Sequence, residues 1–402
     1  MDPLIHRLGL NLAGALALGA CFSTASLPAS AEGTLTFDVE GYDRSHPATL
    51  GLGPAPVAET YTVYAPETAE DYAYNHGAVL TVFQNQFYIQ WQSSFRDEDA
   101  PETRVMYAVS EDGENWSEPR ILAEPRDGVR LTNGGWLSDG ETLIAFLNIW
   151  PLEGTPQGHT EFISSIDGVN WSDAAPVLDE SGAPIQGVIE QDSRALPDGR
   201  ILTSFHMQPG LRAAPYYTFN PLGTDGWTAG AFENLPYEGE VSRELEPSWY
   251  VTPDDEVVMV FRDQGGSHET IFAVSDDMGK TWSAPQMGEF PDSRSKQSAG
   301  NLTPDLAFRV NNPRGDRSRF PLVLSLSDDG YEFDRAYTIR TALADMPPML
   351  FDGKYKRLGY SYPKSLVHDG VLYIAYATHK ERIEITRIPV EALEPEYAVE
   401  RP

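Results

Sequence analysis

From about residue 74 onward, short runs of apolar residues recur along the chain, and polar pairs and turns separate them. In the first such unit the runs are Ala78–Phe83, Phe87–Gln92 and Arg104–Val109. Runs of roughly five to eight residues bounded by Gly, Asn, Asp and Pro are typical of β-strands, whereas a helix needs a longer stretch with an apolar period of about 3.6. Because no stretch shows a convincing helical period, the sequence predicts an all-β protein.

One turn between these runs is repeated. Its complete form, SDDMGKTW, spans residues 275–282, and shorter copies read SEDGENW at 110–116, SIDGVNW at 165–171 and SDDGYEF at 327–333. A reduced copy, TDGW, lies at 224–227. Ser275 and Asp277 can accept hydrogen bonds from turn amides, and Gly279 can adopt a positive φ. The copies begin roughly 50 to 60 residues apart, which is typical of the four-stranded unit of a β-propeller.

The repeated turn resembles the Asp box, S-x-D-x-G-x-x-W, of the sialidase-like (BNR repeat) β-propellers. The resemblance implies antiparallel four-stranded blades, with the boxes serving as turns on the outer rim. We expect six blades, or seven if residues 32–73 form more than one closing strand. The expected domains are a signal peptide at 1–31, an N-terminal extension at 32–73 and the propeller at 74–402.

The first 31 residues have the pattern of a secretory signal: a basic residue, an apolar run and a small-residue end, ASA. The sequence LGAC at 18–21 also resembles a lipobox, which would place a lipid on Cys21. We therefore expect a secreted or periplasmic protein, with an outer-membrane lipoprotein as the alternative. Cys21 is the only cysteine, which excludes disulfides and thiol catalysis in the mature chain.

The formal net charge of −31 disfavours nucleic acids and anionic membranes as partners. If the substrate is itself anionic, cations must be concentrated around the binding site. The expected partner is an anionic polysaccharide or oligosaccharide, bound by a monomer that needs no cofactor. No histidine pair has a tight metal-ligand spacing, so no catalytic metal is predicted, although acidic loops leave a structural Ca²⁺ possible.

The inner strands of a propeller begin around one central funnel, so residues at the start of each unit should meet there. Polar residues recur at that position, and the ends of the second strands add Arg96, His206, Arg262 and Lys380. The predicted catalytic residues are His76, Tyr362, His206 and Arg262. The predicted substrate-binding residues are Arg130, Asn133, Glu190, Gln191, Arg194, Glu246, Lys296, Tyr360 and Lys364.

Each of these residues also has a structural interpretation. Glu246 and Arg262 could form an internal ion pair, the tyrosines could pack beneath the funnel, and His76 could hydrogen bond to a neighbouring loop. As functional groups, an arginine can hold a carboxylate by two parallel hydrogen bonds, and a tyrosine beside a cation can act as acid, base or nucleophile.

The stretch from Glu246 to Trp282 resembles an exo-sialidase, and Tyr360-Ser361 resembles the segment with the sialidase tyrosine nucleophile. His76 stands where those enzymes have their first arginine. That feature resembles instead the ulvan-lyase, rhamnosidase and rhamnose–glucuronate lyase propellers. The resemblance implies a lyase that cleaves uronate-containing glycans by β-elimination, with a glycoside hydrolase and a non-catalytic glycan-binding propeller as the alternatives.

In the β-elimination, Arg262 or Lys364 would bind the carboxylate and His76 would remove the proton. Tyr362 or His206 would protonate the leaving oxygen. In a hydrolase, Glu246 or Glu190 would be the catalytic carboxylate.

Overall fold

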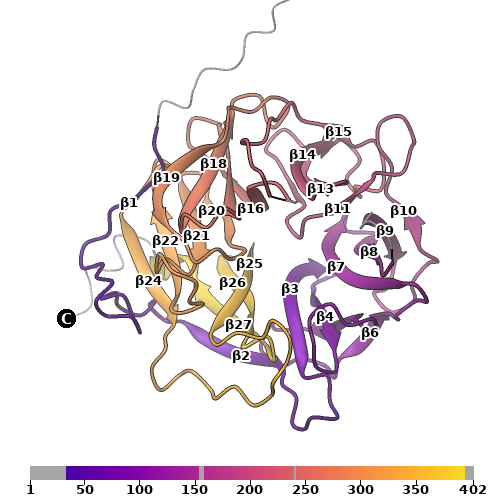
Figure 1. Ribbon diagram of the computed structural model, residues 1–402, viewed down its shortest axis with the longest axis horizontal. Coiled ribbons are helices and arrows are strands. Elements are labelled where there is room, and N and C mark those ends of the chain that lie inside the picture. The colour runs from indigo at the N-terminus through magenta and orange to yellow at the C-terminus, as the bar shows by residue number, and fades with distance from the viewer. Residues whose placement is uncertain (1–32, 154–157, 240, 394–402) are drawn as a thin grey trace, which may run out of the picture.

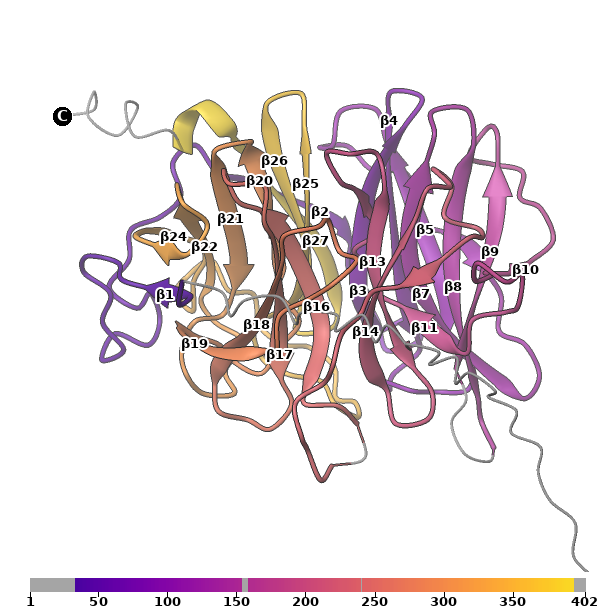
Figure 2. The same cartoon turned by 90° about the horizontal axis from the view of Figure 1, so that it is seen from above.

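The computed structural model describes residues 33–153, 158–239 and 241–393. Within these ranges the chain forms 27 β-strands and one 3-10 helix, η1 (Val390–Leu393). The strands lie in sheets that follow one another around a ring (Figure 1) and run between its two faces (Figure 2). The predicted signal peptide and Cys21 lie outside the described residues. In the described part of the chain, no helix is long and apolar enough to cross a membrane.

The strands form six sheets, which follow one another in chain order, each beginning with its innermost strand. The first two sheets comprise β3 (Tyr74–Phe83), β4 (Gln86–Ser94), β5 (Arg104–Ser110) and β6 (Arg120–Ala123), then β7 (Val129–Ser138), β8 (Leu143–Pro151), β9 (His159–Ser165) and β10 (Ala175–Pro176). The third comprises β11 (Gly187–Ile189) and β12 (Arg194–Ala195), both paired with β13 (Ile201–Met207), then β14 (Arg212–Thr218) and β15 (Thr228–Ala229).

The remaining three sheets complete the ring. The fourth comprises β16 (Glu244–Val251), β17 (Val257–Asp263), β18 (Glu269–Ser275) and β19 (Gln286–Pro291), followed by β1 (Thr36–Phe37) and β23 (Glu332–Phe333). The fifth comprises β20 (Ser298–Thr303), β21 (Leu306–Asn311), β22 (Leu322–Ser327) and β24 (Arg335–Arg340), and the sixth β25 (Tyr360–His368), β26 (Val371–Thr378), β27 (Arg382–Pro389) and β2 (Glu59–Tyr64). The prediction of a β-propeller built from antiparallel four-stranded sheets is confirmed.

The N-terminal segment closes the ring. Strand β2 pairs antiparallel with β27, so an early strand completes the sheet of the last strands, as expected for a closing strand within residues 32–73 (Figure 1). Strand β1 instead pairs in parallel with β19 and β23 at an outer edge. The seven-bladed alternative is wrong, because both strands join existing sheets and no seventh sheet forms among the described residues.

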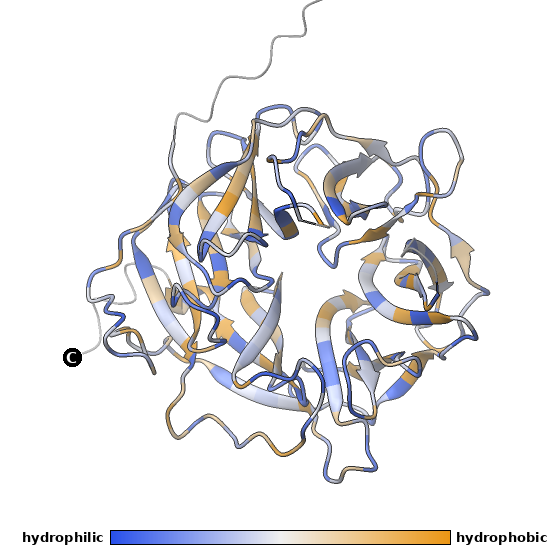
Figure 3. Ribbon diagram, in the orientation of Figure 1, coloured by the Kyte–Doolittle hydropathy of each residue, from blue (hydrophilic) through white to orange (hydrophobic). Residues whose placement is uncertain are grey.

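The hydrophobic core is divided among the interfaces between neighbouring sheets. One cluster joins Leu80 and Trp91 of the first sheet to Ile385 of the sixth, and the same kind of contact recurs around the ring. Figure 3 shows that hydrophobic residues are concentrated in the strands, while the connecting loops are mostly hydrophilic. Each sheet buries both of its faces against its neighbours, which is why many strands are nearly continuous apolar runs.

The repeated turns have the hydrogen bonds that their residue types predict. Ser275 Oγ accepts from the Gly279 amide at 2.8 Å, and Asp277 Oδ1 accepts from the amides of Lys280 and Thr281 at 3.0 and 2.8 Å. Gly279 has φ +87°. Trp282 is 4% exposed and packs in the core between the third and fourth sheets. The turn at 275–282 connects β18 to β19, the third and fourth strands of its sheet, and its hydrogen bonds stabilise that connection.

Candidate active site

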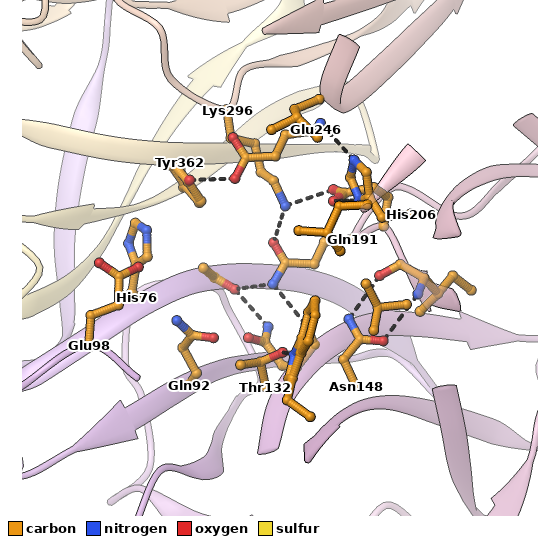
Figure 4. Close-up of a pocket in the computed structure, with 18 of the residues that line it drawn as sticks. His76, Gln92, Glu98, Thr132, Asn148, Gln191, His206, Glu246, Lys296 and Tyr362 are labelled. Carbon is orange, nitrogen blue, oxygen red and sulfur yellow. Dashed lines mark hydrogen bonds and ion pairs between the residues drawn. The ribbon is translucent and has the colours of Figure 1, made fainter. Parts of the chain in front are cut away.

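A pocket opens at the centre of the ring, where the inner strands of several sheets meet (Figure 4). Nine of the thirteen predicted site residues line it: His76, Arg130, Asn133, Glu190, Gln191, His206, Glu246, Lys296 and Tyr362. The spacing of polar residues in the sequence therefore identified the funnel. Their roles in binding or catalysis stay predictions.

Four inner strands bulge where they reach the pocket. The register shifts lie between His76 and Val79 on β3, between Asn133 and Gly135 on β7, between Leu245 and Ser248 on β16, and between Ser361 and Lys364 on β25. Glu246 and Tyr362 lie in two of these bulges with φ of +50° and +56°, a backbone region that costs free energy for a non-glycine residue. Each is followed by a proline, which cannot donate to the ladder. The bulges turn these side chains into the pocket.

Tyr362, Glu246 and Arg262 form one buried hydrogen-bonded group. The Tyr362 hydroxyl donates to Glu246 Oε1, and Arg262 Nη1 donates to the Tyr362 hydroxyl at 3.0 Å and to Glu246 Oε2 at 2.5 Å. The internal ion pair considered as the structural interpretation of Glu246 and Arg262 is therefore present. It holds the carboxylate beside the phenol, so the ion pair also organises the site.

The charges around this group keep Glu246 ionised and Tyr362 protonated. Burial by itself would raise the pKa of Glu246, but Arg262 and Lys296 outweigh burial and hold it below its ordinary value. Burial, followed by the negative charge of Glu246, raises the pKa of Tyr362. The pair therefore consists of a phenol with an adjacent carboxylate that can accept its proton.

His76 lies against Tyr362, with 4.1 Å between the ring centroids. It is 1% exposed, and neither ring nitrogen hydrogen bonds to a described residue. Burial, followed by the charges of Lys380, Arg319 and Lys296, holds the pKa of His76 well below its usual range, so the imidazole is neutral. Among the described residues, no loop hydrogen bonds to the His76 ring, so the structural interpretation of His76 is wrong.

A second buried group lies on the other side of Glu246. Lys296 Nζ contacts Glu190 Oε2 at 2.7 Å and donates to Gln191 Oε1 at 3.0 Å. His206 Nε2 accepts from the Glu246 amide at 3.2 Å, and its Nδ1 lies 3.1 Å from Glu190 Oε1. Since one nitrogen accepts from a backbone amide, the other must donate to Glu190, which assigns the tautomer of His206. This group holds the backbone of Glu246 in place.

The pocket wall contributed by the first two sheets contains Glu98, which the sequence analysis missed. Its carboxylate lies 2.5 Å from Lys380 Nζ, and Figure 4 shows it beside His76. Its side chain is 19% exposed, so it is open to the pocket. Nearby, Arg130 pairs with Asp99 at 2.7 Å and lies over the Trp150 ring. Glu98 follows the second strand of its sheet, so the rule that found His206 and Arg262 would also have found it.

Arg319 is the second functional candidate that the sequence analysis missed. It is 6% exposed, and its Nε and Nη1 have no hydrogen-bond partner among the described residues. Its guanidinium carbon lies 5.4 Å from the centre of the Tyr362 ring. A buried arginine without an acidic partner is costly unless an anion binds to it, so Arg319 points to an anionic ligand. It precedes β22 in an irregular loop, where no repeating pattern signals it.

Four predicted site residues do not line the pocket. One of them, Arg262, binds Glu246 and Tyr362, which do line it, and the other three have their contacts elsewhere. Arg194 pairs with Asp192 at 2.7 Å and stacks on Trp249, and Lys364 is buried 3.3 Å from the same aspartate. The Tyr360 hydroxyl donates to the Thr341 carbonyl at 2.9 Å within the core. Side chains alternate along a strand, and the bulge between Ser361 and Lys364 shifts that alternation, so Tyr362 faces the pocket while Tyr360 and Lys364 do not.

A family model described as "BNR repeat-like domain" matches residues 85–374, which is most of the chain. The chain belongs to this BNR repeat-like family. The predicted resemblance to the sialidase-like, BNR-type propellers is therefore confirmed, and the narrower resemblance to the ulvan-lyase and rhamnosidase propellers stays a prediction.

Several solved structures have the same fold as this chain. A sialidase is 19% identical with a TM-score of 0.60, and the match covers 89% of this chain and 35% of the sialidase. A protein of unknown function from Dyadobacter fermentans is 15% identical (TM-score 0.63; 83% and 99% covered). The intramolecular trans-sialidase from Ruminococcus gnavus is 14% identical (TM-score 0.61; 83% and 98% covered). At these identities the likeness shows the fold alone, and no curated protein matches the chain.

Proposed function

We propose that this protein is a glycoside hydrolase that removes an acidic sugar through a covalent intermediate on Tyr362. The observation that carries the proposal is the hydrogen bond from the Tyr362 hydroxyl to the ionised Glu246, with Arg262 contacting both groups. Several of the similar folds are sialidases, the glycosidases in which a tyrosine serves as nucleophile. That similarity supports the proposal, and the residues of this chain supply its chemistry.

In the first step, the Tyr362 oxygen forms a bond to the anomeric carbon and its proton passes to Glu246. The bond from the anomeric carbon to the leaving oxygen breaks, and the leaving oxygen takes up the proton of the Glu98 carboxyl group, which enters this step protonated. In the second step, water attacks the anomeric carbon and gives a proton to the Glu98 carboxylate, while the bond to Tyr362 breaks and the Tyr362 oxygen regains its proton from Glu246. Two displacements at one carbon restore its original configuration, so the expected outcome is retention.

A neutral phenol suits this reaction if the sugar is anionic. A carboxylate nucleophile would repel a negative charge close to the anomeric carbon, whereas Tyr362 is uncharged until its proton leaves. Arg319 supplies the cation for that charge, because two of its buried nitrogens have no partner among the described residues. Arg262 Nε is also buried and unpartnered among them. Both guanidinium groups lie beside Tyr362, as possible donors to a carboxylate or similar group.

The proposal is tested with a panel of aryl glycosides of acidic sugars, comprising sialosides, other ulosonides and uronides, and with neutral glycosides for comparison. We expect release of the aryl group from at least one acidic glycoside and from none of the neutral ones. Proton NMR of the first product would show retention. Inversion at the anomeric carbon, or hydrolysis of neutral glycosides alone, would contradict the proposal.

His76 supports a second candidate, the β-elimination of a uronate-containing glycan. Its imidazole is neutral, and both ring nitrogens lack a partner among the described residues, so it could remove the proton next to a carboxylate held by Arg319. Tyr362 would then protonate the leaving oxygen. A lyase forms an unsaturated sugar, which ultraviolet absorbance detects, whereas a hydrolase forms none. Binding of acidic glycans with neither product would favour the non-catalytic propeller.

A further inference from the structure

Four arginines on segments next to Tyr362 and to the loop after β17 have no acidic partner among the described residues: Arg294, Arg317, Arg319 and Arg357. None of the four side chains donates a hydrogen bond to, or lies within ion-pair distance of, a carboxylate in the described ranges. Their neighbours differ in this respect, because Arg243 pairs with Asp263 at 2.7 Å and Arg314 with Asp316 at 2.9 Å. The chain has 60 acidic and 29 basic residues, so a group of unpaired cations is unexpected and calls for a function.

Backbone contacts bring three of these arginines together. Residues 319 and 359 form a parallel bridge, in which the Tyr360 amide donates to the Arg319 carbonyl at 2.6 Å. Arg317 and Arg357 each lie two residues before this bridge, on adjacent segments. Arg319 itself is buried beside the Tyr362 ring, whereas Arg317 is exposed and Arg357 is half-buried. The group therefore extends from the Tyr362 ring towards solvent.

Arg294 extends the group on the Arg262 side. It lies in a tight turn in which its amide donates to Asp292 Oδ2 at 2.8 Å, and its Cδ lies near Gly266 in the loop after β17. Its Nε is buried without a partner among the described residues. After burial, the charges of Arg262 and Arg317 lower the pKa of Arg294. The like charges of Arg262 and Arg317 thereby disfavour the charged form of Arg294.

A similar effect acts on Arg319 and on the neighbouring Lys380. Burial lowers the pKa of Arg319 and Tyr362 raises it, while the charges of Arg262 and Arg357 lower it further. Burial lowers the pKa of Lys380 and its partner Glu98 raises it, while the charges of Arg319 and Arg357 add to the lowering. Repulsion among cations destabilises the unliganded protein, and an anion bound between them would relieve it.

We propose that Arg294, Arg317 and Arg357 form a second anion subsite, which binds a sulfate ester or carboxylate carried by the sugar next to the one that is cleaved. The proposal rests on the proposed function, because Arg262 and Arg319 are already assigned to the anionic group of the reacting sugar. Because the two anion sites would each bind one negative group, the substrate would be a glycan with at least two negative groups near the cleaved bond. Guanidinium groups suit this ligand, since they bind sulfate and carboxylate oxygens in a bidentate manner.

The subsite is tested by binding, which needs no turnover. Isothermal titration calorimetry would measure sodium sulfate and sodium acetate binding to the wild type and to a double variant, Arg317→Ala with Arg357→Ala, at constant ionic strength. We expect the double variant to bind the preferred anion at least about tenfold more weakly, which corresponds to the loss of charge-assisted hydrogen bonds. Stronger binding of sulfate would identify a sulfate ester as the ligand, and stronger binding of acetate a carboxylate.

A matched control separates this effect from the general charge of the protein. Arg120 on β6 is exposed and lies away from the pocket, so Arg120→Ala should bind both anions as the wild type does. Arg317 and Arg357 have no described hydrogen-bond partners, so their replacement should leave the fold intact, which circular dichroism would check. Equal binding by the wild type and the double variant would overturn the subsite. It would leave the proposed hydrolysis at Tyr362 untouched, since that is tested on glycosides with a single charge.

Discussion

Replacing Tyr362 by phenylalanine removes one oxygen atom and with it the proposed nucleophile. The ring remains, so its contacts with His76 and with the Arg319 guanidinium should persist. Without the phenolic oxygen no covalent intermediate can form, and we expect kcat on the best acidic glycoside to fall at least about 10³-fold. This corresponds to an increase of roughly 4 kcal/mol or more in the activation free energy.

The cost to stability should be much smaller. The oxygen makes two hydrogen bonds to charged groups, but Glu246 and Arg262 stay paired with each other at 2.5 Å after its removal. The expected loss is that of about one charge-assisted hydrogen bond, roughly 1.5–3 kcal/mol of the free energy of unfolding. Urea denaturation would measure this quantity, and turnover of the aryl glycoside would measure kcat.

Tyr360 provides a matched control two residues away. Its hydroxyl donates to the Thr341 carbonyl in the core and does not reach the pocket, so Tyr360→Phe should cost about 1 kcal/mol of stability and leave kcat unchanged. A Tyr362→Phe variant that keeps more than about one tenth of wild-type turnover would refute the role of Tyr362 as nucleophile. Equal losses of activity in both variants would show that the effect is structural.

Three further predictions follow from other parts of the structure. The pKa of His76 is well below the ordinary value of 6.5 that it regains on unfolding, so the unfolded chain binds the extra proton and stability falls as the pH falls below 6.5. Denaturation at pH 6.5 and 5.5 should show about 1 kcal/mol more loss of stability in the wild type than in His76→Asn. Asp277→Ala removes the acceptor of two turn amides and should lower the free energy of unfolding by about 1–3 kcal/mol. The neighbouring substitution Asp276→Ala should change this free energy by less than about 0.5 kcal/mol. Similar losses of stability in the two variants would contradict the assigned turn. Glu98→Gln should slow the hydrolysis of alkyl glycosides by about 10²-fold or more. The hydrolysis of nitrophenyl glycosides should be slowed far less, because nitrophenolate is a good leaving group that needs no proton. Equal slowing for both substrates would exclude Glu98 as the acid.

The fold could be predicted because its signals are local and repeated. Apolar runs of strand length and a turn with fixed Ser, Asp and Gly positions recur in successive sheets, so each copy supports the others. The closure by β2 could also be anticipated, since a lone early strand would otherwise remain unpaired. The repetition is weakest in the third sheet, where the turn is reduced to TDGW and two short strands, β11 and β12, take the inner position.

The site could be predicted only to the level of a shared position. The counting rule placed His76, Glu246 and Tyr362 around one funnel, because a propeller brings equivalent points of its inner strands together. It could not decide which neighbour on the same strand faces inward, and so it also selected Tyr360 and Lys364. That choice depends on the bulge at Tyr362, whose backbone conformation depends on contacts with other sheets.

The sequence by itself determined the family, the ring of sheets and the region in which the polar residues gather, because periodic patterns specify local structure and its repetition. Only the tertiary structure decided that Tyr362 contacts Glu246, 116 residues away, and that Arg319 lies beside them without a partner among the described residues. The physical reason is that a catalytic pair depends on distances of about 3 Å between atoms of different strands. Such distances are set by bulges, packing and buried charge, none of which leaves a periodic trace in the chain.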